Sequence, residues 1–282
     1  MSYCESIRLR LSDGYEAFAR LWRPEQPRGA ILYLHGIQSH GRWFEVSARR
    51  LADAGFMVLL PDRRGSGRND IDRGHADSAY LLLRDATEAL DELHTRTGFD
   101  RLHVIGVSWG GKVAAALYGH APTRISSLTL VAPGLFPKVD LPLGTKLRVG
   151  WSALVRRKRL FDIPLNDPRL FTANVEYQAF LRNDPLALHQ VTASFLLASR
   201  KMDKLARHMT RHSSATPLHL FLAGHDQIID NDRTRRFVTG LGWPNTKITE
   251  YPSAEHTLEF ETDPEPYFQN LRDWIVQSNS AF

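Results

Sequence analysis

Short apolar runs alternate with longer amphipathic segments through the first half of this chain, and no other feature constrains its fold as strongly. Continuous apolar runs are typical of strands that are buried on both faces of a sheet. The amphipathic segments have helical spacing and end at glycines such as Gly55 and Gly98. This rhythm predicts an α/β fold with helices on both faces of a mostly parallel sheet. The runs expected to form its strands lie at residues 30–34, 56–60, 101–107, 125–131, 217–223 and 247–251.

Two further strands are expected at the start of the chain. Residues 6–11 and 16–23 alternate polar and apolar side chains, and the turn Ser12-Asp13-Gly14 joins them. This pattern predicts an antiparallel pair, which completes a sheet of eight strands. The helices are expected at residues 43–54, 77–97, 109–119, 231–241 and 266–278.

The rhythm changes after Pro133-Gly134. Residues 135–214 contain no clear buried strand, and residues 184–211 are expected to be largely helical. We therefore predict an α/β core formed by residues 1–134 and 215–282, with residues 135–214 inserted after the sixth strand as a helical lid over one end of the sheet.

The basic charge of the chain is concentrated in this insertion. The 282 residues carry a formal net charge of +5, and between Phe136 and His212 there are 14 Lys and Arg against 6 Asp and Glu, a local charge of +8. The run Arg156-Arg157-Lys158-Arg159 lies between two apolar groups and is expected to form a basic amphipathic helix. Such a segment is either a solvated face of the lid or a peripheral contact with an anionic membrane surface or acidic substrates.

The N-terminus and the cysteine content favour a cytoplasmic protein. Residues 1–14 contain no long apolar run, so no secretory signal is expected there. The single cysteine, Cys4, excludes an intramolecular disulfide. No nucleic-acid-binding fold is recognised, so no nucleic-acid partner is expected. No cofactor or metal is expected either, because dinucleotide and phosphate-loop motifs are absent and the histidines show no ligand spacing.

A candidate nucleophile lies directly after a predicted strand and before a predicted helix. The sequence Gly106-Val107-Ser108-Trp109-Gly110 matches the Gly-x-Ser-x-Gly pattern. A serine at the tip of so tight a turn takes strained dihedrals, and glycine neighbours let the turn close. The following helix directs its amide dipoles at the serine and favours negative charge there. We therefore expect Ser108 to be nucleophilic, supported by Gly106 and Gly110.

A base and an acid for this serine occur later in the chain, each just beyond a predicted strand. A serine hydroxyl needs a histidine to accept its proton and a carboxylate to hold that histidine. His256 follows the strand at 247–251, and Asp226 follows the strand at 217–223. Asp230 competes with Asp226 but is expected to cap the next helix instead. Ser108, Asp226 and His256 form the predicted triad.

The loop His35-Gly36-Ile37 is expected to complete an oxyanion hole. Two amides must point at the negative oxygen of a tetrahedral intermediate. The predicted donors are the backbone amides of Ile37 and Trp109, with Gly36 allowing close approach and His35 supporting the loop. Asp62 is expected to be structural, pinning its turn through Arg64 or through backbone amides.

These motifs together resemble those of the α/β-hydrolases. The branch they resemble most contains the monoacylglycerol lipases, the lysophospholipases and the so-called serine aminopeptidases. The resemblance covers residues 1–134 and 215–282. It is carried by His35-Gly36 followed by Gly41, by 61–67 (Pro-Asp-Arg-Arg-Gly-Ser-Gly), by Gly106-x-Ser108-x-Gly110-Gly111, by Gly224-x-Asp226 and by His256.

The resemblance implies a serine hydrolase with a lid that sets the substrate. The expected activity is cleavage of a carboxylic ester, a small-molecule acyl substrate, through an acyl-enzyme on Ser108. The same triad could instead serve an amidase, an aminopeptidase or an acyltransferase. A third alternative is a ligand-binding homologue of the same fold without catalysis.

Overall fold

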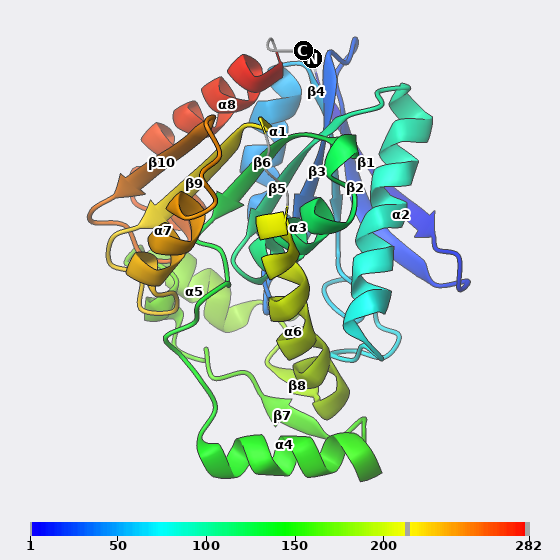
Figure 1. Ribbon diagram of the computed structural model, residues 1–282, viewed down its shortest axis with the longest axis vertical. Coiled ribbons are helices and arrows are strands. Elements are labelled where there is room, and N and C mark those ends of the chain that lie inside the picture. Colours follow the sequence, from blue (N-terminus) through cyan, green and yellow to red (C-terminus); the bar gives the residue numbers. More distant parts are fainter. Residues whose placement is uncertain (1, 212–214, 280–282) are drawn as a thin grey trace.

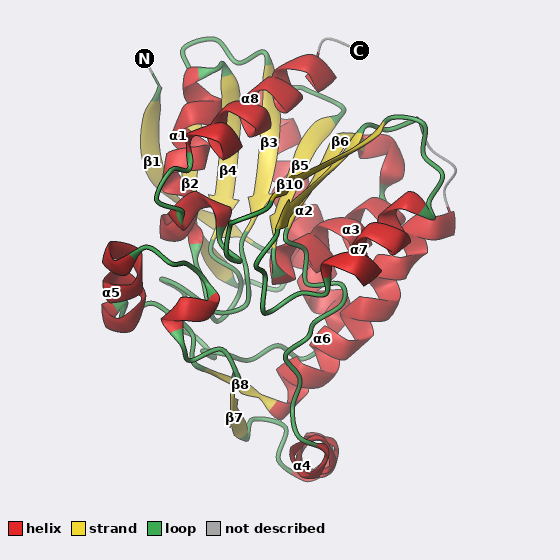
Figure 2. Cartoon of the chain, turned by 90° about the vertical axis from the view of Figure 1, so that its left-hand side faces the viewer, coloured by secondary structure: helices red, strands yellow, loops and turns green. Residues whose placement is uncertain are grey.

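An eight-stranded sheet forms the centre of the computed structural model, which describes residues 2–211 and 215–279 (Figures 1 and 2). Its strand order is β1-β2-β4-β3-β5-β6-β9-β10, and all neighbours are parallel except β1 with β2 and β2 with β4. The strands are β1 (Tyr3–Arg10), β2 (Glu16–Arg23), β3 (Gly29–Leu34), β4 (Phe56–Pro61), β5 (Leu102–Val107), β6 (Ile125–Val131), β9 (Leu218–Ala223) and β10 (Thr246–Tyr251).

The predicted α/β fold and its eight strands are confirmed. Every residue of β3, β5, β6 and β9 is buried, because these central strands are covered on both faces. The edge strand β1 instead leaves most of its side chains exposed or partly exposed, which explains the alternating pattern of its sequence.

Helices cover both faces of the sheet (Figure 2). The helices α1 (Glu45–Asp53) and α8 (Glu265–Asn279) lie on one face, and α2 (Ala79–Thr97), α3 (Trp109–His120) and α7 (Asn231–Thr239) lie on the other. Ser78 caps α2 by accepting a hydrogen bond from the Leu81 amide, and Gly98 ends it in the left-handed conformation. Within residues 2–211 and 215–279, no helix is both long and apolar enough to cross a bilayer.

Most of the elements between β6 and β9 lie beyond the carboxyl end of the sheet, whereas the last helix, α6 (Ala193–Ala206), runs back beside α3 (Figures 1 and 2). The other helices and strands are α4 (Leu143–Val155), β7 (Leu160–Asp162), α5 (Val175–Asn183) and β8 (Gln190–Thr192). The short antiparallel pair β7–β8 was not predicted, since three-residue strands carry no readable period. The helix expected over 184–211 begins only at Ala193, because Thr192 caps it there. Residues 212–214, where the predicted insertion ends, lie outside the described residues.

The basic run at 156–159 forms a turn, so the prediction of a basic helix through it is wrong. The helix α4 ends at Val155, and the Arg159 amide donates to the Arg156 carbonyl at 2.8 Å. The chain reverses here because Phe161 on β7 is buried and β7 pairs with β8. The basic side chains therefore lie at the end of an apolar helix instead of along its face.

Glu259 is a buried carboxyl group that ties α1 to the segment after β10. It accepts hydrogen bonds from the amide and the hydroxyl of Ser47, and burial raises its pKa from the ordinary 4.5 to about 7. As pH rises, Glu259 therefore loses its proton at a lower pH in the unfolded chain than in the folded protein. The free energy of unfolding consequently falls between pH 4.5 and 7.

We expect Glu259→Gln to remove this pH dependence. A shift of this size corresponds to about 3 kcal/mol of unfolding free energy, lost by the wild type as pH rises through that window. The variant should gain about that much stability relative to the wild type between about pH 4 and about pH 8. Urea unfolding at both pH values measures this difference, and an equal difference at the two values would contradict the assigned protonation.

Candidate active site

Ser108 occupies a strained turn between β5 and α3. Its dihedrals are φ 52° and ψ −123°, a region that non-glycine residues rarely adopt. The turn is held by a hydrogen bond from its amide to the Val131 carbonyl at 2.9 Å. A Cβ atom on Gly110 would lie 2.2 Å from the Leu34 carbonyl oxygen, so this position requires glycine. The strain and the close packing present the Ser108 side chain at the carboxyl edge of the sheet.

His256 and Asp226 lie hydrogen-bonded to each other at the ends of neighbouring strands. The distance from His256 Nδ1 to Asp226 Oδ2 is 2.7 Å, and each residue is 2% exposed. The other carboxylate oxygen of Asp226 accepts hydrogen bonds from the amides of Ile228 and Ile229. An ionised carboxylate accepts only, so His256 donates through Nδ1 and Nε2 carries the free lone pair.

His256 lines the same cavity as the candidate nucleophile. Ser108 and His256 both line a narrow cavity with Gly36, Leu165 and Phe171. His256 Nε2 is buried and has no hydrogen-bond partner among the described residues. Ser108 and His256 thus line one cavity, and His256 is hydrogen-bonded to Asp226.

Asp230, the competing acid, lies at the start of α7. Its carboxylate accepts a hydrogen bond from the Arg233 amide at 2.9 Å, as expected for a helix cap. No interaction between Asp230 and His256 occurs among the described residues.

The loop after β3 brings Ile37 beside Ser108. His35 Nδ1 lies 2.8 Å from the Gly36 carbonyl oxygen, and His35 Nε2 lies 2.8 Å from the Arg63 amide nitrogen. Because the Arg63 amide can only donate, His35 donates from Nδ1. Burial and the nearby Arg63 guanidinium hold the pKa of His35 well below its usual range, so the ring stays neutral. The His35 ring thus links the loop after β3 to the turn after β4.

Ile37 and Trp109 both line the cavity that contains Ser108. Neither backbone amide donates to another backbone group among the described residues. Gly36 packs so closely that a Cβ atom there would lie 3.3 Å from Ser108 Cβ. The two residues predicted to form the oxyanion hole thus lie beside the serine, and the glycine that precedes Ile37 carries no side chain that would block the approach of a substrate.

A cavity of about 440 Å³ extends from Ser108 toward the inserted elements. Most of its wall is apolar, contributed by Val139, Leu141, Val149, Ile163, Leu165, Leu196, Ile228 and Ile229. One part of the wall is polar, where Lys112 pairs with Asp203 at 2.5 Å and Lys146 pairs with Asp140. Burial lowers the pKa of Lys112, and Asp203 opposes that effect.

The sequence did not indicate which side chains of the insertion reach the site. Trp109 Nε1 donates to Ser199 Oγ at 2.8 Å, and its ring stacks on Phe195 with centroids 5.4 Å apart. Both partners lie on α6, far along the chain from Trp109, so no local pattern links them. Helical spacing alone could have placed Phe195 and Ser199 on one face of α6.

Asp62 has the structural role expected of it, through backbone amides. It accepts hydrogen bonds from the amides of Gly41 and Arg68 and pairs with Arg20. The suggested partner Arg64 instead pairs with other carboxylates. In the described part of the chain, no group of three His, Cys, Asp or Glu side chains is placed to hold a metal ion.

Known proteins of similar sequence and structure share this arrangement of chain. The monoacylglycerol lipase of Mycolicibacterium smegmatis is 25% identical over 269 residues, which cover 91% of each chain. The monoglyceride lipase of Homo sapiens is 23% identical over 217 residues, which cover 69% of this chain and 72% of that one. The crystal structure of a Paleococcus ferrophilus monoacylglycerol lipase superposes with a TM-score of 0.82 at 19% identity, covering 94% of this chain and 100% of the other.

A match to a family model identifies the wider family to which the chain belongs. The model described as serine aminopeptidase, S33, matches residues 25–263, which include Ser108, Asp226 and His256. The eight-stranded sheet has the architecture of the α/β-hydrolases, as the structural similarity also indicates. The chain therefore belongs to the serine aminopeptidase S33 family of α/β-hydrolases, within the branch that resembles the monoacylglycerol lipases.

Proposed function

We propose that this protein hydrolyses a carboxylic ester of an acyl chain through a covalent acyl-enzyme on Ser108. The main support is the hydrogen bond between His256 Nδ1 and Asp226, which leaves His256 Nε2 unpaired in a residue that lines the same cavity as Ser108. The relatives named as monoacylglycerol and monoglyceride lipases support an ester as substrate.

In the first step, His256 Nε2 takes the proton of Ser108 Oγ as that oxygen attacks the ester carbonyl carbon. The negative carbonyl oxygen is received by the amides of Ile37 and Trp109. Asp226 holds the imidazole in the required tautomer and stabilises the imidazolium. Collapse of the intermediate expels the alcohol, which takes its proton from His256, and leaves the acyl group on Ser108. Water then repeats the sequence and releases the acid.

The cavity beside Ser108 favours an acyl ester over a peptide with a free amine. Its largely apolar wall suits an acyl chain. A free amino group would need an unpaired carboxylate, but Asp203 is paired with Lys112 and Asp140 with Lys146. These pairs argue against the aminopeptidase alternative.

Labelling with a fluorophosphonate probe tests the proposal. The probe should add its mass once to the intact protein, and peptide mapping should place that mass on Ser108. Turnover of p-nitrophenyl esters of increasing chain length should fall in proportion to the labelled fraction, and the preferred length would measure the cavity. Saturable ester binding without labelling or turnover would favour the non-catalytic alternative.

We also propose that the insertion at 135–214 is a lid that docks on an anionic lipid surface. Helix α4 lies at the extremity of the molecule farthest from the chain termini (Figures 1 and 2). Leu143, Leu147, Trp151 and Leu154 lie three or four residues apart along α4 and are 66–79% exposed. The basic turn at 156–159 follows this stripe directly, so apolar insertion and attraction to anionic headgroups act at one place.

Trp151→Ser should weaken binding to vesicles of phosphatidylcholine and phosphatidylglycerol by about tenfold, because the variant buries less apolar surface. Cosedimentation with vesicles measures this affinity. Tyr3→Ser is the matched control, since Tyr3 is 58% exposed and is the first residue of β1, a strand far from α4 in Figure 2. Equal binding by the wild type and Trp151→Ser, or equal weakening by Tyr3→Ser, would contradict docking through α4.

A further inference from the structure

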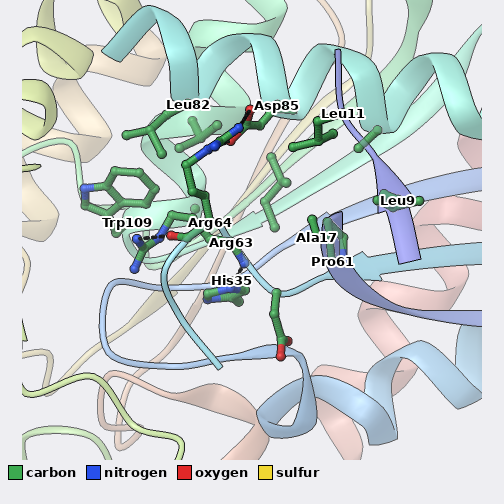
Figure 3. Close-up of a pocket in the computed structure, with 16 residues that line it drawn as sticks. Leu9, Leu11, Ala17, His35, Pro61, Arg63, Arg64, Leu82, Asp85 and Trp109 are labelled. Carbon is green, nitrogen blue, oxygen red and sulfur yellow. Dashed lines mark hydrogen bonds and ion pairs between the residues drawn. The ribbon is translucent and has the colours of Figure 1, made fainter. Parts of the chain in front are cut away.

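Two adjacent arginines in the turn after β4 take different directions (Figure 3). Arg64 reaches the carboxylates of Asp85 and Asp13 and lies over the Tyr15 ring. Arg63 lies instead with Trp109 and His35, beside the candidate oxyanion hole. The ion pairs of Arg64 explain its place in the fold. Arg63 is not explained in that way, because its side-chain partners are main-chain oxygens and ring faces.

The guanidinium of Arg63 contacts the surroundings of both predicted oxyanion donors. Its Nη2 donates to the Ile37 carbonyl oxygen at 2.9 Å. This hydrogen bond restricts the peptide unit that contains the Ile37 carbonyl, which is the next peptide unit along the chain after the one that contains the Ile37 amide. Its Cζ lies 5.1 Å from the centroid of the Trp109 ring and 4.7 Å from that of Phe195. One side chain therefore holds the loop after β3 on one side and the residue after Ser108 on the other.

The backbone of Arg63 acts on the same loop through His35. The Arg63 amide donates to His35 Nε2, which leaves the proton of the neutral ring on Nδ1. His35 Nδ1 then donates to the Gly36 carbonyl oxygen. This oxygen and the Ile37 N–H belong to one planar peptide unit and point in opposite directions. Fixing the Gly36 oxygen therefore fixes the direction of the Ile37 amide.

Burying the Arg63 guanidinium costs free energy of hydration, and the stability of the fold alone does not explain why this cost is accepted. Arg63 Nε is buried and has no hydrogen-bond partner among the described residues. Burial lowers the pKa of Arg63 to about 10, although the group stays charged at neutral pH. An apolar side chain of similar length would be buried with less loss of hydration. The charge and planar shape of the guanidinium are thus explained by the groups that it holds.

We infer that Arg63 is a positioning residue of the oxyanion hole, its side chain clamping Ile37 and Trp109 and its backbone fixing the tautomer of His35. The inference rests on the proposed function, because it presupposes that these two amides receive the negative oxygen. Arg63 does not itself contact the reacting atoms. Its contribution is to keep both amides aimed where charge develops in the transition state.

Arg63→Met tests the side-chain clamp while leaving the backbone link to His35 in place. We expect kcat for a p-nitrophenyl ester to fall by about 10- to 100-fold, less than the loss of a whole oxyanion donor, with KM nearly unchanged. A trifluoromethyl ketone analogue of the transition state should bind more weakly by the factor by which kcat/KM falls. Arg63→Lys, which keeps a donor for the Ile37 carbonyl but not the flat stacking surface, should recover part of the loss.

Arg64→Met is the matched control, since it removes a neighbouring guanidinium for which no contact with Ile37 or Trp109 occurs among the described residues. It should lower the unfolding temperature through its lost ion pairs and leave kcat within about twofold of the wild type. An active wild type whose kcat and ketone affinity are unchanged by Arg63→Met would overturn this inference alone. An equal loss of kcat in both variants would also overturn it, because integrity of the turn would then be the cause. A wild type that does not turn over esters would overturn the proposed function and, with it, the role of Arg63.

Discussion

Replacing Ser108 by alanine should lower kcat for ester hydrolysis by about 10⁶-fold, the size of loss that accompanies removal of a triad nucleophile. The covalent route is then closed, because the hydroxyl that the strained turn between β5 and α3 presents is that of Ser108. KM should change little, since the apolar cavity wall is intact. Steady-state kinetics with a p-nitrophenyl ester measure both constants.

The fold should survive this substitution. Alanine is smaller than serine and introduces no steric clash, so the unfolding temperature should stay close to that of the wild type. A Ser108→Ala variant that is folded and retains more than a few per cent of kcat would show that another group attacks the ester.

Replacing Asp226 by asparagine should lower kcat by about 10⁴-fold. The side-chain oxygen of the introduced asparagine would still accept from the amides of Ile228 and Ile229, so the loop should hold its shape. The new NH₂ group, however, would donate to His256 Nδ1 and reverse the tautomer. His256 Nε2 would then carry a proton and could not accept one from Ser108.

Asp230→Asn is the matched control for this prediction. Asparagine caps helices about as well as aspartate, so α7 should remain capped and kcat should stay within about twofold of the wild type. If Asp230→Asn were the variant that lost activity, and Asp226→Asn were not, the acid of the triad would have been assigned to the wrong residue.

The core of the fold could be read from the sequence because its signals are local. Each central strand is a short, mostly apolar run, and β5 leads into the Gly-x-Ser-x-Gly turn within one stretch of chain. Asp226 and His256 could be located because carboxyl ends of parallel strands meet at one edge of the sheet. Their hydrogen bond follows from that topology and needs no knowledge of the insertion.

The insertion could not be read in the same way. The strands β7 and β8 are three residues long and lie far apart in the chain. The sequence of the basic turn is compatible with a helix, and only the burial of Phe161 on β7 in the folded chain explains the turn. The contacts of Arg63 with Ile37 and Trp109 join two separate loops and the first turn of α3. Such contacts depend on side-chain direction in the folded chain, and neither composition nor hydrophobic periodicity predicts that direction.

Detection of the acyl-enzyme would identify the residue that attacks the ester. The wild-type protein should be mixed with a p-nitrophenyl ester, quenched in acid within milliseconds and examined by intact mass spectrometry and peptide mapping. We predict a mass increase equal to the acyl group, located on Ser108, together with a burst of p-nitrophenol that does not exceed the enzyme concentration. Acyl mass located on another residue, with turnover that continues when Ser108 is alanine, would show that Ser108 is not the nucleophile.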